Sequence, residues 1–140
     1  MNISTTHEED RTITELDHAR LARIARNRQP ESSGAGPIET VLDAADLVPS
    51  RGVPPDVVTM YTQVQLADLA SDRKYRLTLC YPADADPAAG LVSVLSPVGA
   101  SLLGLRVGAV ARWRQPDGEE GAAEVQGILF QPESSGDYTL

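Results

Sequence analysis

Apolar residues recur at helical spacing near the start of the chain. A helical wheel at about 100° per residue places a set of aliphatic side chains on roughly half of its circumference. The pattern predicts an amphipathic helix from Glu15 to about Asn27. Thr14 is positioned to cap this helix, and Asp17 at the third helical position can make the return contact of a capping box. The apolar positions of this face are Ile13, Leu16, Leu21 and Ile24.

A second apolar stripe follows a break in the chain. The break is the sequence "RQPESSGAGP", in which prolines remove backbone donors and glycines free the backbone. A second helix is predicted to begin near Pro37 and to end before Pro49, with an apolar stripe at three- and four-residue steps. The two segments together predict a short antiparallel helical hairpin that reaches about 20 Å at 1.5 Å per residue. The residues of the second stripe are Ile38, Val41, Leu42, Ala45 and Val48.

The pattern changes to that of strands after the proline-rich stretch "PSRGVPPD". From Tyr75 to Tyr81 apolar and polar residues alternate with the period of a half-buried strand. Further strands are predicted around 64–66, 91–95, 110–114 and 122–130, and a short helix over 98–105.

This order of elements predicts an α+β fold with four parts. We expect a disordered N-terminus over residues 1–12, the helical hairpin over 13–48, a proline-rich linker over 49–56 and a sheet domain over 57–140.

Composition narrows the classes of function. The net charge of −8 opposes binding to nucleic acid, so we expect no direct sequence-specific contact with it. A single cysteine cannot form an internal disulfide, and no apolar run approaches the length of about 18 residues that a membrane span requires. The start of the chain lacks the pattern of a secretory signal. We therefore expect a cytoplasmic protein that does not bind membranes, and we expect a monomer.

The candidate chemical groups are sparse. The glycines at 99 and 104 have P-loop spacing, but Leu105 and Arg106 stand where that motif needs Lys and Ser or Thr. His7, His18 and Cys80 are too scattered for a metal site, and Cys80 alternates within a strand with no histidine nearby in the sequence. The loop carboxylates Asp84 and Asp86 lack the further ligands of a calcium loop. We expect no catalytic residue, no cofactor and no bound metal.

One stretch does resemble a known family. "VSVLSPVGASLLGLRVG" is similar to the signature in the C-terminal domain of the Gre-type (GreA/GreB) transcription elongation factors, which stimulate transcript cleavage. "PPDVVTM", "YPADADPAAG" and "LFQPESSGDYTL" resemble the Rnk-like branch of that family, so the likeness covers nearly all of residues 54–140. The hairpin, from "ITELDHARL", matches this branch in plan. Leu95 and Tyr61 depart from the usual pattern: the Gre factors often carry a polar or acidic residue at the first position, and Rnk-like sequences commonly carry asparagine at the second.

The resemblance implies an FKBP-like C-terminal domain, a curved and mainly antiparallel sheet with one short helix, preceded by a short coiled coil. It also implies binding to RNA polymerase near the secondary channel, in competition with Gre-type factors. The residues that match the polymerase-contacting loop of the family are Ser96, Pro97, Val98, Gly99 and Ala100.

Two enzymatic alternatives accompany this hypothesis. Gre factors place an acidic pair at the tip of a long coiled coil, whereas the tip here carries only Glu31 among arginines, on a hairpin too short for a deep channel. The sequence therefore favours a non-enzymatic regulator over a cleavage stimulator. Prolyl isomerase activity is suggested only by the implied fold, and the few aromatic residues oppose a prolyl pocket.

Overall fold

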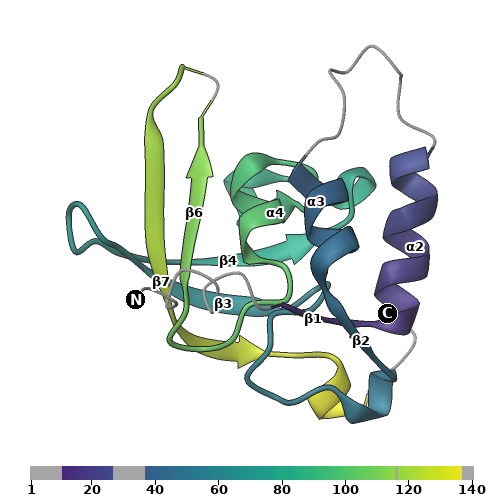
Figure 1. Ribbon diagram of the computed structural model, residues 1–140. Helices are drawn as coiled ribbons and strands as arrows, with labels where there is room; N and C mark the ends of the chain where they lie inside the picture. Colours follow the sequence, from purple (N-terminus) through teal and green to yellow (C-terminus); the bar gives the residue numbers. More distant parts are fainter. Residues whose placement is uncertain (1–10, 27–36, 116, 137–140) are drawn as a thin grey trace, which may run out of the picture.

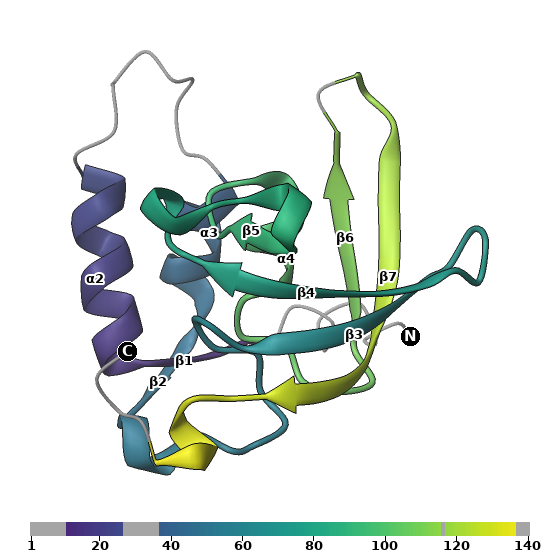
Figure 2. The same cartoon turned by 180° about the vertical axis from the view of Figure 1, so that it is seen from behind.

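A strongly curved five-stranded sheet wraps around one short helix, and a helical hairpin packs beside them (Figures 1 and 2). The computed structural model describes residues 11–26, 37–115 and 117–136. The predicted α+β class is confirmed. In chain order the helices and strands are β1 (Thr12–Thr14), α2 (Glu15–Arg26), α3 (Pro37–Ala44), β2 (Asp46–Val48), β3 (Gln63–Asp68), β4 (Lys74–Cys80), β5 (Leu91–Ser93), α4 (Pro97–Leu102), β6 (Val110–Arg114) and β7 (Glu120–Phe130).

The sheet has the strand order β5-β4-β3-β7-β6. All neighbours are antiparallel except β4 and β5, which run parallel. The long strand β7 pairs with β6 over its first half and with β3 over its second, and its register with β3 shifts twice. Such irregularities bend a strand, and this bend lets the sheet enclose α4.

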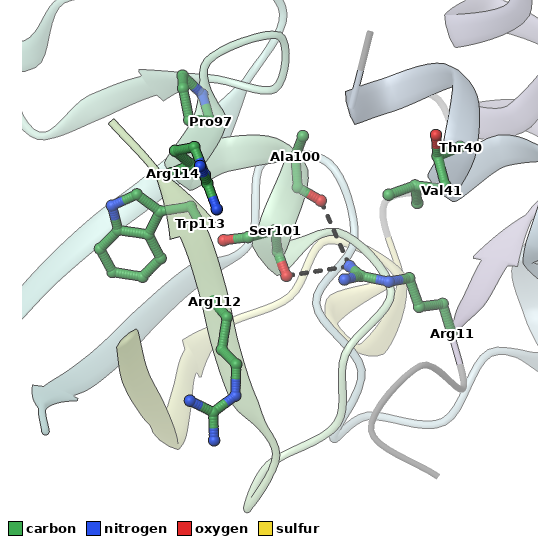
Figure 3. Close-up of a pocket in the computed structure, with 9 residues that line it drawn as sticks. All are labelled: Arg11, Thr40, Val41, Pro97, Ala100, Ser101, Arg112, Trp113 and Arg114. Atoms are coloured by element: carbon green, nitrogen blue, oxygen red, sulfur yellow. Dashed lines mark hydrogen bonds between the residues drawn. The ribbon is translucent and has the colours of Figure 1, made fainter. Parts of the chain in front are cut away.

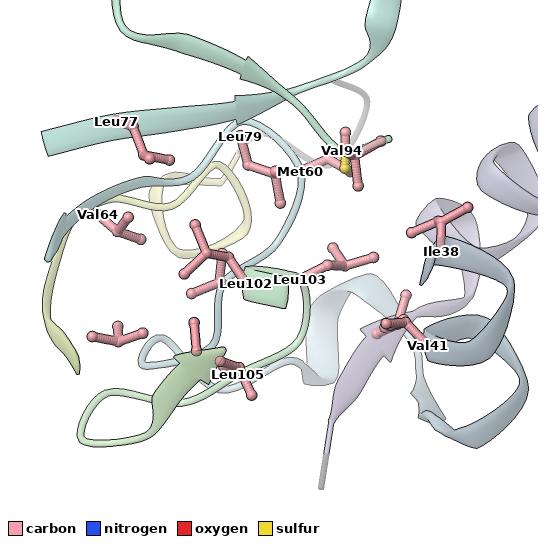
Figure 4. Close-up of a cluster of buried hydrophobic side chains, with 14 of the residues drawn as sticks. Ile38, Val41, Met60, Val64, Leu77, Leu79, Val94, Leu102, Leu103 and Leu105 are labelled. Atoms are coloured by element: carbon pink, nitrogen blue, oxygen red, sulfur yellow. The ribbon is translucent and has the colours of Figure 1, made fainter. Parts of the chain in front are cut away.

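One apolar core joins the hairpin to the sheet (Figure 4). Leu102, Leu103 and Leu105 are buried as predicted and lie between the sheet and the hairpin residues Ile38 and Val41. The stretch 49–56 between hairpin and sheet includes a 3₁₀ turn over Ser50–Gly52. Removing residues 1–53 would expose the apolar surface that these elements cover, so point substitutions are the better test of function.

The two helices run antiparallel, and the predicted cap is present. The backbone N–H of Asp17 donates to Oγ1 of Thr14 over 3.0 Å. The predicted end of the second helix is wrong: α3 ends at Ala44, and Asp46–Val48 form strand β2, parallel to β1. Because β1 offers backbone partners, this segment gains ladder hydrogen bonds that a further helical turn would not provide.

The start of the described chain is built into the fold. Residues 1–10 of the segment predicted to be disordered lie outside the described residues, whereas Arg11 and Thr12 have defined partners. The Thr12 N–H donates to the Gly104 carbonyl over 3.0 Å. Nη1 of Arg11 donates to the carbonyl oxygens of Ala100, Ser101 and Leu103, at 3.3, 3.0 and 2.9 Å. Arg11 therefore binds carbonyls at the C-terminal end of α4 that lack helical donors.

Replacing Arg11 with methionine tests this contact. The change keeps an aliphatic chain but removes charged hydrogen bonds, so we expect the free energy of unfolding to fall by about 1.5–3 kcal/mol in urea denaturation. Arg106→Met is the matched control, because Arg106 is half exposed and lies 3.6 Å from Asp56. This exposed pair is expected to contribute less than about 1 kcal/mol. Equal losses in the two variants would contradict the assigned role of Arg11.

Candidate docking site

The beginning of α4 is fixed by a serine and a proline. The Ser96 Oγ accepts a hydrogen bond from the Gly99 N–H at 3.1 Å and donates to the Ser93 carbonyl at 2.7 Å. Pro97 occupies the first helical position, where its missing N–H costs nothing. The sequence Ser-Pro therefore sets both the start and the direction of this helix.

Gly99 allows α4 to approach β5. A Cβ atom added at Gly99 would lie 2.0 Å from the Ser93 carbonyl oxygen and 3.0 Å from the Val94 Cα. Both neighbours are backbone atoms and cannot rotate away. The approach of helix to strand at this point requires a residue without a side chain.

The five predicted contact residues divide into two groups. Ser96, Pro97 and Val98 are half-buried and reach the surface, and we call them the Ser-Pro end of α4. Gly99 and Ala100 are buried and position this end. Of the five predicted contact residues, those of the Ser-Pro end are therefore the ones that can contact a partner directly.

A groove runs beside α4, between α3 and the edge strand β6 (Figure 3). It has a volume of about 350 Å³, and we call it the α4 groove. Its lining residues are Arg11, Thr40, Val41, Pro97, Ala100, Ser101, Arg112, Trp113 and Arg114. Pro97 belongs both to this groove and to the Ser-Pro end, so the two surfaces are continuous.

Sequence reasoning missed the arginines of the α4 groove. Arg112 and Arg114 are exposed on β6, and Arg11, the residue before β1, reaches the groove from the other side (Figure 3). The alternation in "VARWR" indicated a strand, but nothing in it indicated that β6 would lie opposite Arg11. The groove thus gathers three cations in a chain whose net charge is −8.

Trp113 is held against a glycine of the neighbouring strand. Gly121 is its cross-strand partner, and a Cβ added there would lie 2.4 to 2.6 Å from atoms of the indole. Beside it, Nη2 of Arg114 lies 3.0 Å from Oε2 of Glu120 in an exposed ion pair. The glycine therefore sets the position of the indole at the groove wall.

A buried carboxyl group lies where the hairpin meets the sheet domain. Asp17 is 3% exposed, and its Oδ2 accepts a hydrogen bond from the Met60 N–H at 3.3 Å. Burial raises the pKa of Asp17 to about 6, and the negative charge of Glu133 acts in the same direction. Glu133 itself accepts a hydrogen bond from the Thr59 hydroxyl at 2.7 Å. Asp17 thus links α2 to the segment before β3, but burial disfavours the charged form of its carboxyl group.

Tyr61 explains one departure from the family pattern. Its φ is +64°, a left-handed conformation that asparagine adopts more readily than other non-glycine residues. Its ring packs against Tyr81 with centroids 5.7 Å apart, and its hydroxyl donates to Asp84. Burial, together with this contact to Asp84, raises the pKa of Tyr61 to about 12. These contacts hold a bulky side chain at a position that suits asparagine.

The other candidate groups do not come together as a reactive site. Nε2 of His18 lies 3.2 Å from the Leu42 carbonyl oxygen and so joins the two helices of the hairpin. Cys80 is buried, and burial raises the pKa of its thiol, which disfavours the nucleophilic thiolate. Asp86 is exposed at the start of a short turn, and His7 lies outside the described residues. Within the described ranges, no three His, Cys, Asp or Glu side chains are grouped to hold a metal ion.

No helix in the described part of the chain is long and apolar enough to cross a membrane.

Comparisons with known proteins agree with this architecture. The family model described as "Transcription elongation factor, GreA/GreB, C-term" matches residues 53–129. The chain is 37% identical over 131 residues to the "Regulator of nucleoside diphosphate kinase" of Escherichia coli strain K12, a match that covers 91% of this chain and 95% of that protein. It is 36% identical over 81 residues to the transcription elongation factor GreA of Chloroherpeton thalassium, covering 58% of this chain and 51% of that protein.

A solved structure covers the hairpin as well as the sheet domain. The GreA/GreB transcription elongation factor from Nitrosomonas europaea superposes with a TM-score of 0.70 at 31% identity, covering 86% of this chain and 98% of the other. The chain belongs to the GreA/GreB transcription elongation factor family. Its similarity to the E. coli regulator, over nearly the whole length of both chains, agrees with the Rnk-like features in its sequence.

Proposed function

We propose that this chain is a non-enzymatic transcription regulator that binds RNA polymerase near the secondary channel and competes there with Gre-type factors. The observation that carries the proposal is the Ser-Pro end of α4. It matches the polymerase-contacting loop of the family, and it is held at the surface by the Ser96 cap and by the close approach at Gly99. We expect the protein to act as a cytoplasmic monomer.

The effect on transcription would come from occupancy. A bound copy would cover the surface that a Gre-type factor needs, and no bond would have to be made or broken. The α2 helix has 12 residues and is therefore about 18 Å long at 1.5 Å per residue. Residues 27–36 of the tip, with Glu31 as their only carboxylate, lie outside the described residues. The short arm and the sequence of the tip favour a regulator over a cleavage stimulator.

A substitution at the Ser-Pro end tests the docking surface. Pro97→Glu adds bulk and charge at the first helical position, where glutamate is well tolerated, so the fold should persist. We expect its affinity for core RNA polymerase to fall by about tenfold or more, the effect of losing one central contact of an interface. Binding can be measured by fluorescence anisotropy with the labelled full chain.

Pro87→Glu is the matched control for this change. Pro87 is exposed, and like Pro97 it occupies the first position of a short helical segment, here the 3₁₀ turn Pro87–Ala89. This variant should bind like the wild type. Equal affinity of the Pro97 variant and the wild type for the polymerase would show that the Ser-Pro end is not part of the interface.

The two enzymatic alternatives have direct assays. Backtracked elongation complexes incubated with the protein should keep their transcripts at full length, and shortened transcripts would establish cleavage stimulation instead. A proline-containing peptide should isomerise at its uncatalysed rate, because Trp113 is the only aromatic residue among the described ones that line the α4 groove.

A further inference from the structure

The Ser-Pro end is too small to form a stable interface by itself. It contains three half-buried residues, Ser96, Pro97 and Val98. A stable protein–protein interface buries about 800 Å² on each partner and involves about 20–30 residues a side. A polymerase that docks at the Ser-Pro end must therefore cover neighbouring surface as well. This step rests on the proposed function.

The α4 groove is the neighbouring surface that shares a residue with the Ser-Pro end. Pro97 lines the groove, and so does Trp113 on the edge strand β6 (Figure 3). Val41 and Ala100 contribute further apolar atoms to its lining. With a volume of about 350 Å³, the groove has room for a protruding side chain of a partner. An apolar side chain of a polymerase docked at the Ser-Pro end therefore finds a complementary surface directly beside it.

Trp113 is the residue of this groove best suited to anchor a partner. It is the only tryptophan of the chain, and it is half-buried. Tryptophan is among the residues most enriched at the hot spots of interfaces. Because a Cβ on its cross-strand partner Gly121 would lie 2.4 to 2.6 Å from atoms of the indole, the ring rests directly on the backbone of β7. A ring that is already held in place loses little conformational entropy when a partner covers it.

We propose that Trp113 is an anchor residue of the interface with RNA polymerase, and that the polymerase inserts an apolar side chain into the α4 groove beside the indole. The interface then runs from the Ser-Pro end through Pro97 into the groove. The indole supplies apolar contact area, and the contact requires no charged group of the groove. Docking is thereby fixed at two points, the Ser-Pro end and Trp113.

Replacing Trp113 with alanine tests the anchor. We expect the affinity for core RNA polymerase, measured by fluorescence anisotropy with the labelled full chain, to fall by about tenfold or more. Phe130→Ala is the matched control, because Phe130 is an aromatic residue of the neighbouring strand β7 that is 43% exposed and does not line the groove. This control should bind like the wild type. Wild-type affinity of Trp113→Ala would overturn the proposal.

A second variant leaves Trp113 and its packing intact. Thr40 is exposed on α3 and lines the groove from the side opposite β6 (Figure 3). Thr40→Glu places a good helix former at this exposed position, so the fold should persist while the longer, charged side chain obstructs the groove. We expect the affinity for the polymerase to fall about threefold to tenfold. Ala44→Glu adds the same charge at an exposed position of α3 that does not line the groove, and it should bind like the wild type. Equal affinities of these two variants would contradict insertion into the groove.

A spectroscopic readout separates contact with the polymerase from a purely structural role of Trp113. Hydroxytryptophan, incorporated in place of this single tryptophan, is excited at longer wavelengths than the ordinary tryptophans of the polymerase. We expect its quenching by the neutral quencher acrylamide to decrease when core RNA polymerase is bound. Unchanged quenching in the bound state would show that the indole supports the fold and lies outside the interface. Quenching that decreases as the chain alone is concentrated would assign the indole to contact with a second copy, and would also overturn the proposal.

The anchor and the proposed function fail in different ways. If Pro97→Glu lost affinity while Trp113→Ala and Thr40→Glu kept it, docking at the Ser-Pro end would stand and its extension into the groove would be wrong. If the wild type did not bind the polymerase, the proposed function would be wrong, and the anchor with it.

Discussion

The Gly99→Ala variant is expected to lose about 3 kcal/mol of its free energy of unfolding. The new methyl group would lie 2.0 Å from the Ser93 carbonyl oxygen, closer than real side chains come to a backbone atom. Relief would require α4 to move away from β5, and that movement would open the core beneath the buried Leu102 and Leu103. The intrinsic preference of a helix for alanine over glycine returns only about 1 kcal/mol. Urea denaturation followed by circular dichroism measures the loss.

Gly127→Ala is the matched control for this prediction. Gly127 lies in β7, and a Cβ added there would meet no atom within 4 Å. Its free energy of unfolding should stay within about 0.5 kcal/mol of the wild type. If Gly99→Ala were as stable as this control, α4 would not be wedged against β5 and the position of the Ser-Pro end would need another explanation.

The second large effect is a pH-dependent gain in stability on replacing Asp17 with asparagine. The pKa of Asp17 is about 6 in the folded protein against an ordinary value of 3.8. The folded state therefore binds this proton more tightly than the unfolded state. The resulting stabilisation is fully present below about pH 4 and is lost as the pH rises through 6.

Asparagine remains neutral at every pH and can still accept the hydrogen bond from Met60. At about pH 7.5 we expect the free energy of unfolding of D17N to exceed that of the wild type by about 1–2 kcal/mol, less than the full linkage value because the amide adds donors that need partners. The advantage should shrink by about pH 4.5, where the wild-type carboxyl is largely protonated. Asp43→Asn, which alters an exposed carboxylate of α3, controls for the lost charge. An advantage of D17N that did not change with pH would contradict the buried-charge explanation.

Periodicity predicted the elements well where burial alone decides the structure. The alternation from Tyr75 to Tyr81 gave β4, and the three- and four-residue steps after Pro37 gave most of α3. The same spacing wrongly predicted that the helix continues to Val48, because Val48 fits the helical stripe equally well. Only its pairing with β1 makes Val48 a strand residue. That pairing is a tertiary effect that a local pattern does not contain.

The candidate site was predictable only in part. The family signature pointed to residues 96–100, and the structure adds that Gly99 and Ala100 are buried beneath the Ser-Pro end. The basic lining of the α4 groove was not predictable, because Arg11 and Arg112 are 101 residues apart in the sequence and line the same groove only in the folded protein. The positive φ of Tyr61 could not be predicted from the sequence either. The sequence showed only that a tyrosine stands where Rnk-like sequences commonly carry asparagine.

We propose that this chain shares a docking surface on RNA polymerase with Gre-type factors. The most direct measurement is equilibrium competition, in which core RNA polymerase carrying a fluorescent Gre-type factor is titrated with the unlabelled chain. We expect full displacement of the labelled factor by the wild type and by Pro87→Glu, whereas Pro97→Glu should require at least about tenfold more protein. Binding of the wild-type chain to the polymerase without displacement of the Gre-type factor would show that the two proteins dock on separate surfaces.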